Sequence, residues 1–162
     1  MVIDRIAEKL DVKIQKEKLN GMIGEFKIGT EKVLLVKPTT YMNLSGNCVG
    51  EILNFYKVLP QDLIVVYDDI DIDVGKIRIK PSGSSGTHNG MRDISKKIGT
   101  NDFIRVRVGS GKPKDNQDLA DYVLGCFKKD EIEDISKAIE KASEAVLEIL
   151  KKGVHSAMNK FN

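Results

Sequence analysis

Residues 63–69 read Leu-Ile-Val-Val-Tyr-Asp-Asp, an apolar run that leads directly into two carboxylates. A short run of this kind, rich in β-branched residues, is typical of a strand that is covered on both faces. In open α/β sheets, ligands bind beyond the carboxyl ends of the strands, so Asp68 stands where chemistry is expected. The stretch therefore predicts an inner strand of an α/β protein, with a candidate site at its end.

Strands and helices alternate on both sides of this run. Apolar residues at helical spacing predict helices over 1–10, 44–57, 91–98 and 130–152. Alternating or β-branched stretches predict strands over 22–28, 33–36, 76–80 and 103–108, with a hairpin turn at 29–32 and a short apolar run at 122–127. The order predicts a single domain over residues 1–162, in which helices flank one twisted mixed β-sheet of the α/β class.

Length and composition bound the class of protein. The chain has 162 residues, 41% hydrophobic and 31% charged, which suits one folded domain and excludes a disordered chain. No apolar run is long enough to span a bilayer, and the first residues lack the pattern of a secretory signal. The two cysteines, Cys48 and Cys126, lie far apart between apolar neighbours. They favour a reducing cytoplasm over a disulfide framework.

The net charge of +2 conceals a polarised distribution. Between Lys76 and Lys114 lie ten basic residues against two acidic ones, a charge of +8, which leaves −6 for the rest of the chain. The basic residues are Lys76, Arg78, Lys80, Arg92, Lys96, Lys97, Arg105, Arg107, Lys112 and Lys114. A basic side would suit a polyanion such as nucleic acid. The alternative is that these residues form the solvated faces of strands and a helix.

A Gly/Ser-rich loop at residues 82–90 ends at a predicted helix start and contains His88 beside Asn89. Backbone N–H groups in such a loop can receive an anion, although no Gly-Lys-Ser/Thr follows as in a nucleotide-binding P-loop. The Asn89 amide offers donors and an acceptor that suit a peptide carbonyl or a water molecule. The competing interpretation of Asn89 is a helix cap.

Residues 39–46 form a second polar segment at a loop-to-helix junction. Asn43 presents another amide there, and Tyr41 and Met42 supply apolar area that could rest against a sugar or an amino-acid side chain. Taken singly, Asn43 and Ser45 are also ordinary capping residues. At the end of the buried strand, Asp68 could orient and charge-stabilise an imidazole.

Metal binding is not predicted. Asp69, Asp71 and Asp73 mimic the start of a calcium loop, but Val74 holds the required glycine position and Lys80 the glutamate position. These acids are interpreted as turn caps or partners of nearby lysines. The two histidines and two cysteines show no ligand spacing, and His155 is interpreted as a helix-end cation.

Six segments, taken together, resemble the bacterial-type peptidyl-tRNA hydrolase family. They are KPTTYMNLSG (37–46), the strand ending in Asp68, SGTHNGMRDI (85–94), IRVRVGSGKP (104–113), DYVLG (121–125) and AMNKFN (157–162). The resemblance implies a monomeric, cytoplasmic α/β enzyme without metal or organic cofactor. Its activity would be hydrolysis of the ester between peptide and tRNA, which recycles tRNA from stalled translation.

The resemblance also implies roles for individual residues. Asp68 matches the acid that holds the catalytic imidazole, and His88 a supporting histidine beside the cleft. The positions matching those that bind the tRNA–peptide end are Tyr41, Met42, Asn43 and Asn89. Lys80, Arg92 and Arg107 fall on the side implied to receive tRNA phosphates.

One departure from the family pattern concerns the general base. Family members begin with a strand, a Gly-rich turn and a Thr-Arg-His-Asn segment whose histidine is that base, and this sequence contains no such segment. A start codon placed too late, a truncated product and a replacement base at His88 are the three explanations considered. The sequence predicts impaired hydrolysis, lower by about 10²–10⁴-fold.

Two other functions stay open beside the esterase. A non-catalytic tRNA-binding remnant would use the same basic residues without turnover. A nucleotide-binding enzyme would use residues 83–90, which lack a phosphate-binding lysine.

Overall fold

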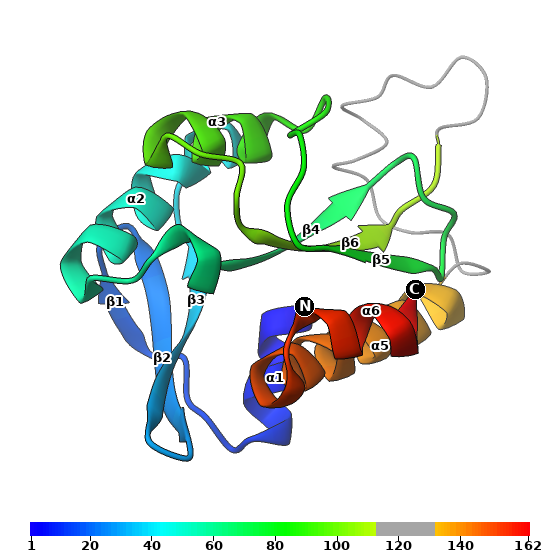
Figure 1. The fold of residues 1–162 in the computed structure, drawn as a ribbon, viewed down its shortest axis with the longest axis horizontal. Coiled ribbons are helices and arrows are strands. Elements are labelled where there is room, and N and C mark those ends of the chain that lie inside the picture. Colours follow the sequence, from blue (N-terminus) through cyan, green and yellow to red (C-terminus); the bar gives the residue numbers. More distant parts are fainter. Residues whose placement is uncertain (113–131) are drawn as a thin grey trace. The chain divides into compact units, whose positions relative to one another are not determined.

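The computed structural model describes residues 1–112 and 132–162, drawn as a ribbon in Figure 1. The chain divides into two compact units. The first contains Met1, Ile3–Ile64 and Pro81–Ile104, and the second Val2, Val65–Lys80 and Arg105–Asn162. The short apolar run at 122–127, the segment DYVLG (121–125) and Cys126 lie outside the described residues. A single domain over 1–162 stays a prediction.

The first unit contains an antiparallel sheet in the order β1-β2-β3. Its strands are β1 (Lys16–Lys18), β2 (Gly21–Ile28) and β3 (Glu31–Pro38). Ile28 pairs with Glu31, so the hairpin turn is only two residues long, and Gly29 adopts the left-handed φ of 59° at its start. The unit's helices are α1 (Val2–Lys9), η1 (Met42–Leu44), α2 (Ser45–Tyr56), η2 (Pro60–Asp62) and α3 (Asn89–Ile98).

The core of the first unit forms where α2 faces the sheet. Ile23 of β2 packs with Cys48 and Ile52 of α2, and all three side chains are buried. Burial, with a smaller effect from Glu51, raises the pKa of the Cys48 thiol to about 11. Cys48 is therefore a protonated core residue at neutral pH, in keeping with its interpretation as a reduced thiol.

The second unit contains a mixed sheet in the order β4-β6-β5. Its strands are β4 (Ile64–Asp69), β5 (Ile77–Lys80) and β6 (Ile104–Gly109), and β5 pairs antiparallel with β6. Backbone hydrogen bonds join Ile104 N to Leu63 O and Ser110 N to Asp69 O. In both bonds the donor residue lies 41 positions after the acceptor residue (104 − 63 and 110 − 69). Only a parallel arrangement keeps that spacing constant, so β4 and β6 run parallel.

Two helices, α5 (Ile132–Lys152) and α6 (Val154–Phe161), contact β5 in the second unit. The apolar side chains of Ile77, Ile79 and Val106 are buried, as is the alanine-rich face of α5. Asn162 pairs with the outer edge of β5, because its amide accepts from Ile79 N (2.7 Å) and donates to Ile79 O (2.9 Å). The side chain thus satisfies backbone groups that an edge strand would otherwise expose.

The α/β class is confirmed, and most predicted helices and strands lie within a few residues of the observed ones. The described residues form two three-stranded sheets rather than the single sheet predicted. Strand β1 and helix α6 are additional to the predicted elements. His155 lies in the first turn of α6, so its interpretation as a helix-end cation is wrong. Ile132 is an apolar residue of the helix predicted over 130–152, yet its side chain is 55% exposed at the start of α5.

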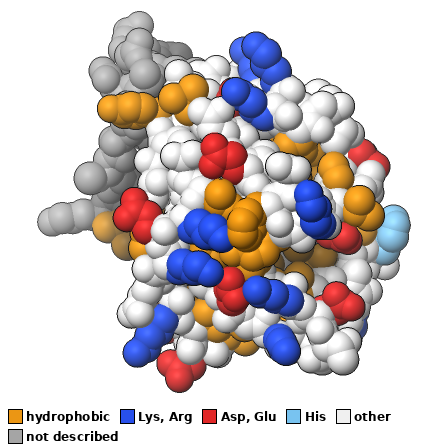
Figure 2. Space-filling view, turned by 90° about the vertical axis from the view of Figure 1, so that its left-hand side faces the viewer, with side chains coloured by type: hydrophobic (Ala, Val, Ile, Leu, Met, Phe, Trp, Pro, Cys, Tyr) orange, Lys and Arg blue, Asp and Glu red, His pale blue; other side chains and the backbone are white. Residues whose placement is uncertain are grey.

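The face shown in Figure 2 carries charges of both signs around exposed hydrophobic side chains. It corresponds to the side on which α2 and β1 lie in Figure 1. At the end of α2, Phe55 is 53% exposed and the Lys18 ammonium lies 3.4 Å from the centroid of its ring. Such cation–π contacts let a lysine cover an exposed ring.

Two glycines of α2 give opposite predictions for alanine substitution. A Cβ on Gly46 would collide with the backbone carbonyl of Asp93, whereas one on Gly50 would meet only Lys97 Cβ at 3.9 Å. Gly46→Ala is expected to lower the free energy of unfolding by about 2–3 kcal/mol through overpacking. Gly50→Ala should raise it by about 0.5–1 kcal/mol through helix propensity. Urea unfolding measures both, and equal effects would contradict the close packing at Gly46.

Candidate active site

Asp68 lies at the carboxyl end of β4, as the sequence predicts. Successive side chains of a strand point to opposite faces, so Asp68 projects away from the face that carries Tyr67 and Asp69. The side chains of Ile77, Ile79 and Val106, which point away from the basic residues of β5 and β6, are buried. Asp68 itself is partly buried. A carboxylate in this position, at the rim of a sheet, could hold an oriented imidazole.

The basic residues of β5 and β6 share one face of their sheet. Arg78 stands opposite Arg107, and Lys80 stands opposite Arg105. Arg78 and Lys80 are exposed, which confirms the wet, basic face predicted for residues 76–80. Arg105 is only 1% exposed, and burial lowers its pKa. The expectation that Arg105 is a solvated cation is therefore wrong.

Arg107 pairs with Asp69 across β6 and β4. Its Nε–H donates to Asp69 Oδ2 over 2.8 Å, and the side chains are only 20% and 14% exposed. Burial alone would lower the pKa of Arg107, but the hydrogen bond and charge of Asp69 outweigh burial and raise it. The sequence favours a turn cap or a lysine partner as the role of Asp69. It does cap the turn, because Oδ1 accepts from Asp71 N, but its charged partner is an arginine.

In the first unit, the two amide-bearing segments pack against each other. The short helix η1, which contains Met42 and Asn43, contacts α3, which begins at Asn89. A Cβ on Gly90 would lie 2.8 Å from Met42 Sδ and 3.1 Å from Met42 O, so a larger residue there would force Met42 to shift. The Asp93 carboxylate also accepts from Gly46 N over 2.7 Å. The structure therefore brings together the segments 37–46 and 85–94, with Asn43 and Asn89 both exposed.

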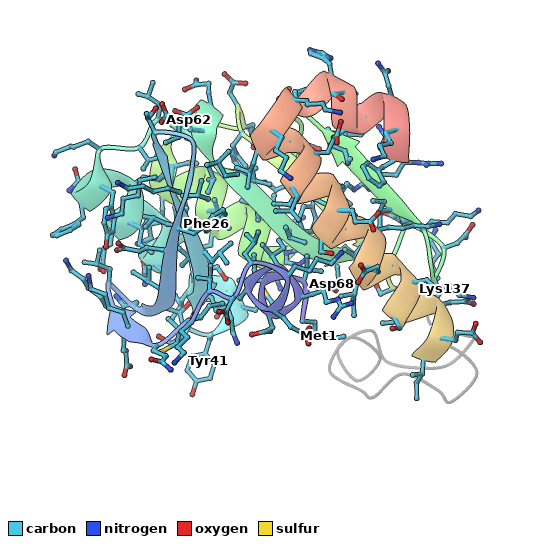
Figure 3. All side chains as sticks on the ribbon, turned by 90° about the horizontal axis from the view of Figure 1, so that it is seen from below. Met1, Phe26, Tyr41, Asp62, Asp68 and Lys137 are labelled. Carbon is cyan, nitrogen blue, oxygen red and sulfur yellow. The ribbon has the colours of Figure 1, made fainter. Side chains whose placement is uncertain are left out.

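The side chains of Tyr41 and Met42 face solvent beside this junction. Tyr41 is 82% exposed and Met42 58% exposed, and Figure 3 shows the Tyr41 ring projecting from the molecule. Contiguous exposed apolar patches can mark binding surfaces, and Tyr41 and Met42 are adjacent in the chain. Both residues are thus available for the apolar contacts predicted from the sequence.

His88 is the N-cap of α3, a role that the sequence suggests for Asn89. Its Nδ1 accepts from Met91 N over 3.2 Å, while Asn89 is the first residue of the helix. Arg92 donates from Nε to Gly86 O over 2.9 Å and so ties the Gly-rich loop to α3. The amide of Asn89 is therefore not needed as a cap, and the local role of His88 is structural.

The predicted site residues divide between the two units. Tyr41, Met42, Asn43, His88, Asn89 and Arg92 belong to the first, and Asp68, Lys80 and Arg107 to the second. The structure brings the first group together around η1 and α3. The proximity of the two groups stays a prediction. Asp93 joins α2 to α3 and cannot be identified from the sequence, because the residue whose N–H it accepts, Gly46, lies 47 positions away.

The family model for peptidyl-tRNA hydrolase matches residues 1–162. The chain belongs to the peptidyl-tRNA hydrolase family. It is 49% identical over 161 residues to a peptidyl-tRNA hydrolase of Clostridium botulinum strain Alaska E43, covering 99% of this chain and 83% of that protein. The relative from strain Hall is 48% identical, with 99% and 84% covered.

Solved structures of peptidyl-tRNA hydrolases share this fold. The crystal structure of the Acinetobacter baumannii enzyme superposes with a TM-score of 0.91 at 32% identity, covering 98% of this chain and 81% of that one. A crystal structure of a peptidyl-tRNA hydrolase in complex with N-propanol gives the same values. The segments around Asn43 and Asn89 thus lie in a chain that matches the family over its whole length.

Two properties of the described residues bear on partners. Over 1–112 and 132–162, no helix is both long and apolar enough to cross a membrane. The same residues contain no group of three or more His, Cys, Asp or Glu side chains that could hold a metal ion. A metal-free mechanism in this peptidyl-tRNA hydrolase relative stays a prediction.

The capping role of His88 predicts a difference between two substitutions. His88→Ala removes the acceptor of Met91 N and should lower the free energy of unfolding by about 0.5–2 kcal/mol. His88→Asn supplies a side-chain oxygen and should stay within about 0.5 kcal/mol of the parent. Urea unfolding measures both, with exposed His155→Ala as control. Equal losses for Ala and Asn would show that His88 is not a cap.

Proposed function

We propose that this chain binds peptidyl-tRNA and acts on the ester between the peptide and the tRNA, so that tRNA is recycled from stalled translation. The observation that carries the proposal is the packing of η1 on the first turn of α3. It presents two exposed amides, Asn43 and Asn89, from segments that resemble the family pattern. Amides of this kind can hold a peptide carbonyl and position water. Tyr41 and Met42 supply apolar contacts to the same substrate end.

The chemistry requires a base that removes a proton from water. Asp68 is proposed to orient and charge-stabilise an imidazole in that role, while Asn43 and Asn89 position the substrate. The Nδ1 atom of His88 accepts from the backbone of α3, and His155 is an exposed residue of α6. These are the two histidines of the 162 residues, and neither is proposed as the base.

The cationic residues are proposed to bind tRNA phosphates. Lys80 and Arg92 are exposed, and Arg107 is half-buried beside Asp69. Such contacts release counterions, so tRNA binding should weaken steeply as salt rises. The proposal includes a monomeric, cytoplasmic protein that needs neither a metal nor an organic cofactor.

A non-catalytic tRNA-binding protein is the second candidate. It is favoured by the placement of both imidazoles, because His88 caps a helix and His155 lies on α6. The two candidates share the binding residues and differ only in turnover.

The imidazole requirement gives a direct test with N-acetyl-aminoacyl-tRNA as substrate. A polypeptide of these 162 residues should hydrolyse it about 10²–10⁴-fold more slowly than a relative with a general base. Added imidazole should restore part of the rate in a saturable way, after subtraction of the protein-free reaction. Asp68→Asn should abolish the rescue, whereas Asp73→Asn, which removes an exposed acid paired with Lys76, should preserve it.

The outcomes separate the candidates. A full family rate without imidazole would contradict the assignment of the two histidines. Binding without rescue at any imidazole concentration would favour the non-catalytic candidate. Rescue that survives Asp68→Asn would remove Asp68 from the mechanism.

A further inference from the structure

Asp69 uses both carboxylate oxygens within the second unit. Oδ1 accepts from Asp71 N over 2.9 Å, which fixes the side chain against its own turn. Oδ2 accepts from Arg107 Nε over 2.8 Å. The carboxylate is therefore held at one oxygen and holds the arginine at the other.

The pair leaves most of the guanidinium available. An arginine has five N–H donors, and Asp69 takes the one at Nε. Within residues 1–112 and 132–162, no other residue is hydrogen-bonded to the Arg107 side chain or forms an ion pair with it. Both terminal nitrogens can therefore donate to a phosphate in the forked geometry that arginine prefers.

The Asp69–Arg107 pair is shielded from solvent and has a second arginine beside it. With side-chain exposures of 14% and 20%, Asp69 and Arg107 are shielded more than the surface pairs that contribute little. Arg78 stands directly opposite Arg107 on the neighbouring strand, and like charges in that position repel. The negative charge of Asp69 offsets this repulsion, and its Oδ2 accepts from Arg107 Nε.

We propose that Asp69 is a positioning residue for tRNA binding, which holds Arg107 by Nε so that its two terminal nitrogens face a phosphate. The inference rests on the proposed function, because it assumes that Arg107 meets tRNA. It concerns an acid that projects from the sheet face opposite Asp68 and has no role in proton transfer.

The proposal predicts an effect of opposite sign to simple charge counting. Removing a negative charge near a polyanion site should tighten RNA binding if only the overall field matters. If Asp69 positions Arg107, removing its charge should weaken binding instead. Asp69→Asn tests this, because an Asn oxygen can still accept from Asp71 N while its amide nitrogen cannot accept from Arg107.

Asp71→Asn is the matched control. Asp71 lies on the same turn and its loss changes the charge equally, but its side chain is 62% exposed and lies 3.4 Å from Lys112 rather than Arg107. Dissociation constants for deacylated tRNA, which carries no amino acid, would be measured over a series of salt concentrations. Asp69→Asn should weaken binding about tenfold and reduce the salt slope by about one contact. Asp71→Asn should leave binding unchanged or tighter.

A second pair of variants guards against misfolding of Asp69→Asn. Arg107→Lys keeps the charge but loses the Nε–H and the fork, so it should weaken tRNA binding as Asp69→Asn does. In an Arg107→Gln background, Asp69→Asn should cause no further weakening. Parent-like binding by Arg107→Lys, or tighter binding by Asp69→Asn, would overturn the inference. Absence of salt-dependent tRNA binding by the parent chain would instead overturn the proposed function.

Discussion

The close approach of η1 to the first turn of α3 is the constraint on which the candidate site depends. Glycine at position 90 favours this approach, because a Cβ there would lie 2.8 Å from Met42 Sδ. Gly46 serves the neighbouring contact of α2 with α3, where a Cβ would collide with the backbone of Asp93. The hydrogen bond from Gly46 N to the Asp93 carboxylate then joins α2 to α3. Segments that are distant in the chain thereby present Asn43 and Asn89 from rigid elements, which is what a preorganised polar site needs.

The cations of the second unit are arranged in cross-strand pairs of like charge. Arg78 and Arg107 stand opposite each other in the sheet, as do Lys80 and Arg105. Adjacent like charges cost stability unless an acid or a bound anion offsets them. Asp69 does this for Arg107, and Arg78 donates to the Asn162 backbone carbonyl over 2.7 Å. The face thus holds one cation neutralised by an acid, Arg107, beside exposed cations such as Lys80.

Sequence patterns predict the features that depend on local periodicity. The apolar run before Asp68 identifies β4, and alternation places Arg105 and Arg107 on one face. Burial of Arg105 cannot be foreseen, because alternation does not show what covers a face. Capping rules favour Asn over His, so they point to Asn89 rather than His88 as the cap. The division of the described strands into two three-stranded sheets depends on long-range pairing, which no local pattern encodes.

The central claim is that Asn43 and Asn89 act on the same ligand. The most direct measurement is the NMR shift of both side-chain amides during titration with a non-hydrolysable 3′-(N-acetylaminoacyl)amino-adenosine, a mimic of the peptidyl end of tRNA. The account predicts that the two amide signals shift together and saturate with one dissociation constant. A shift at one amide only, or two different dissociation constants, would contradict it.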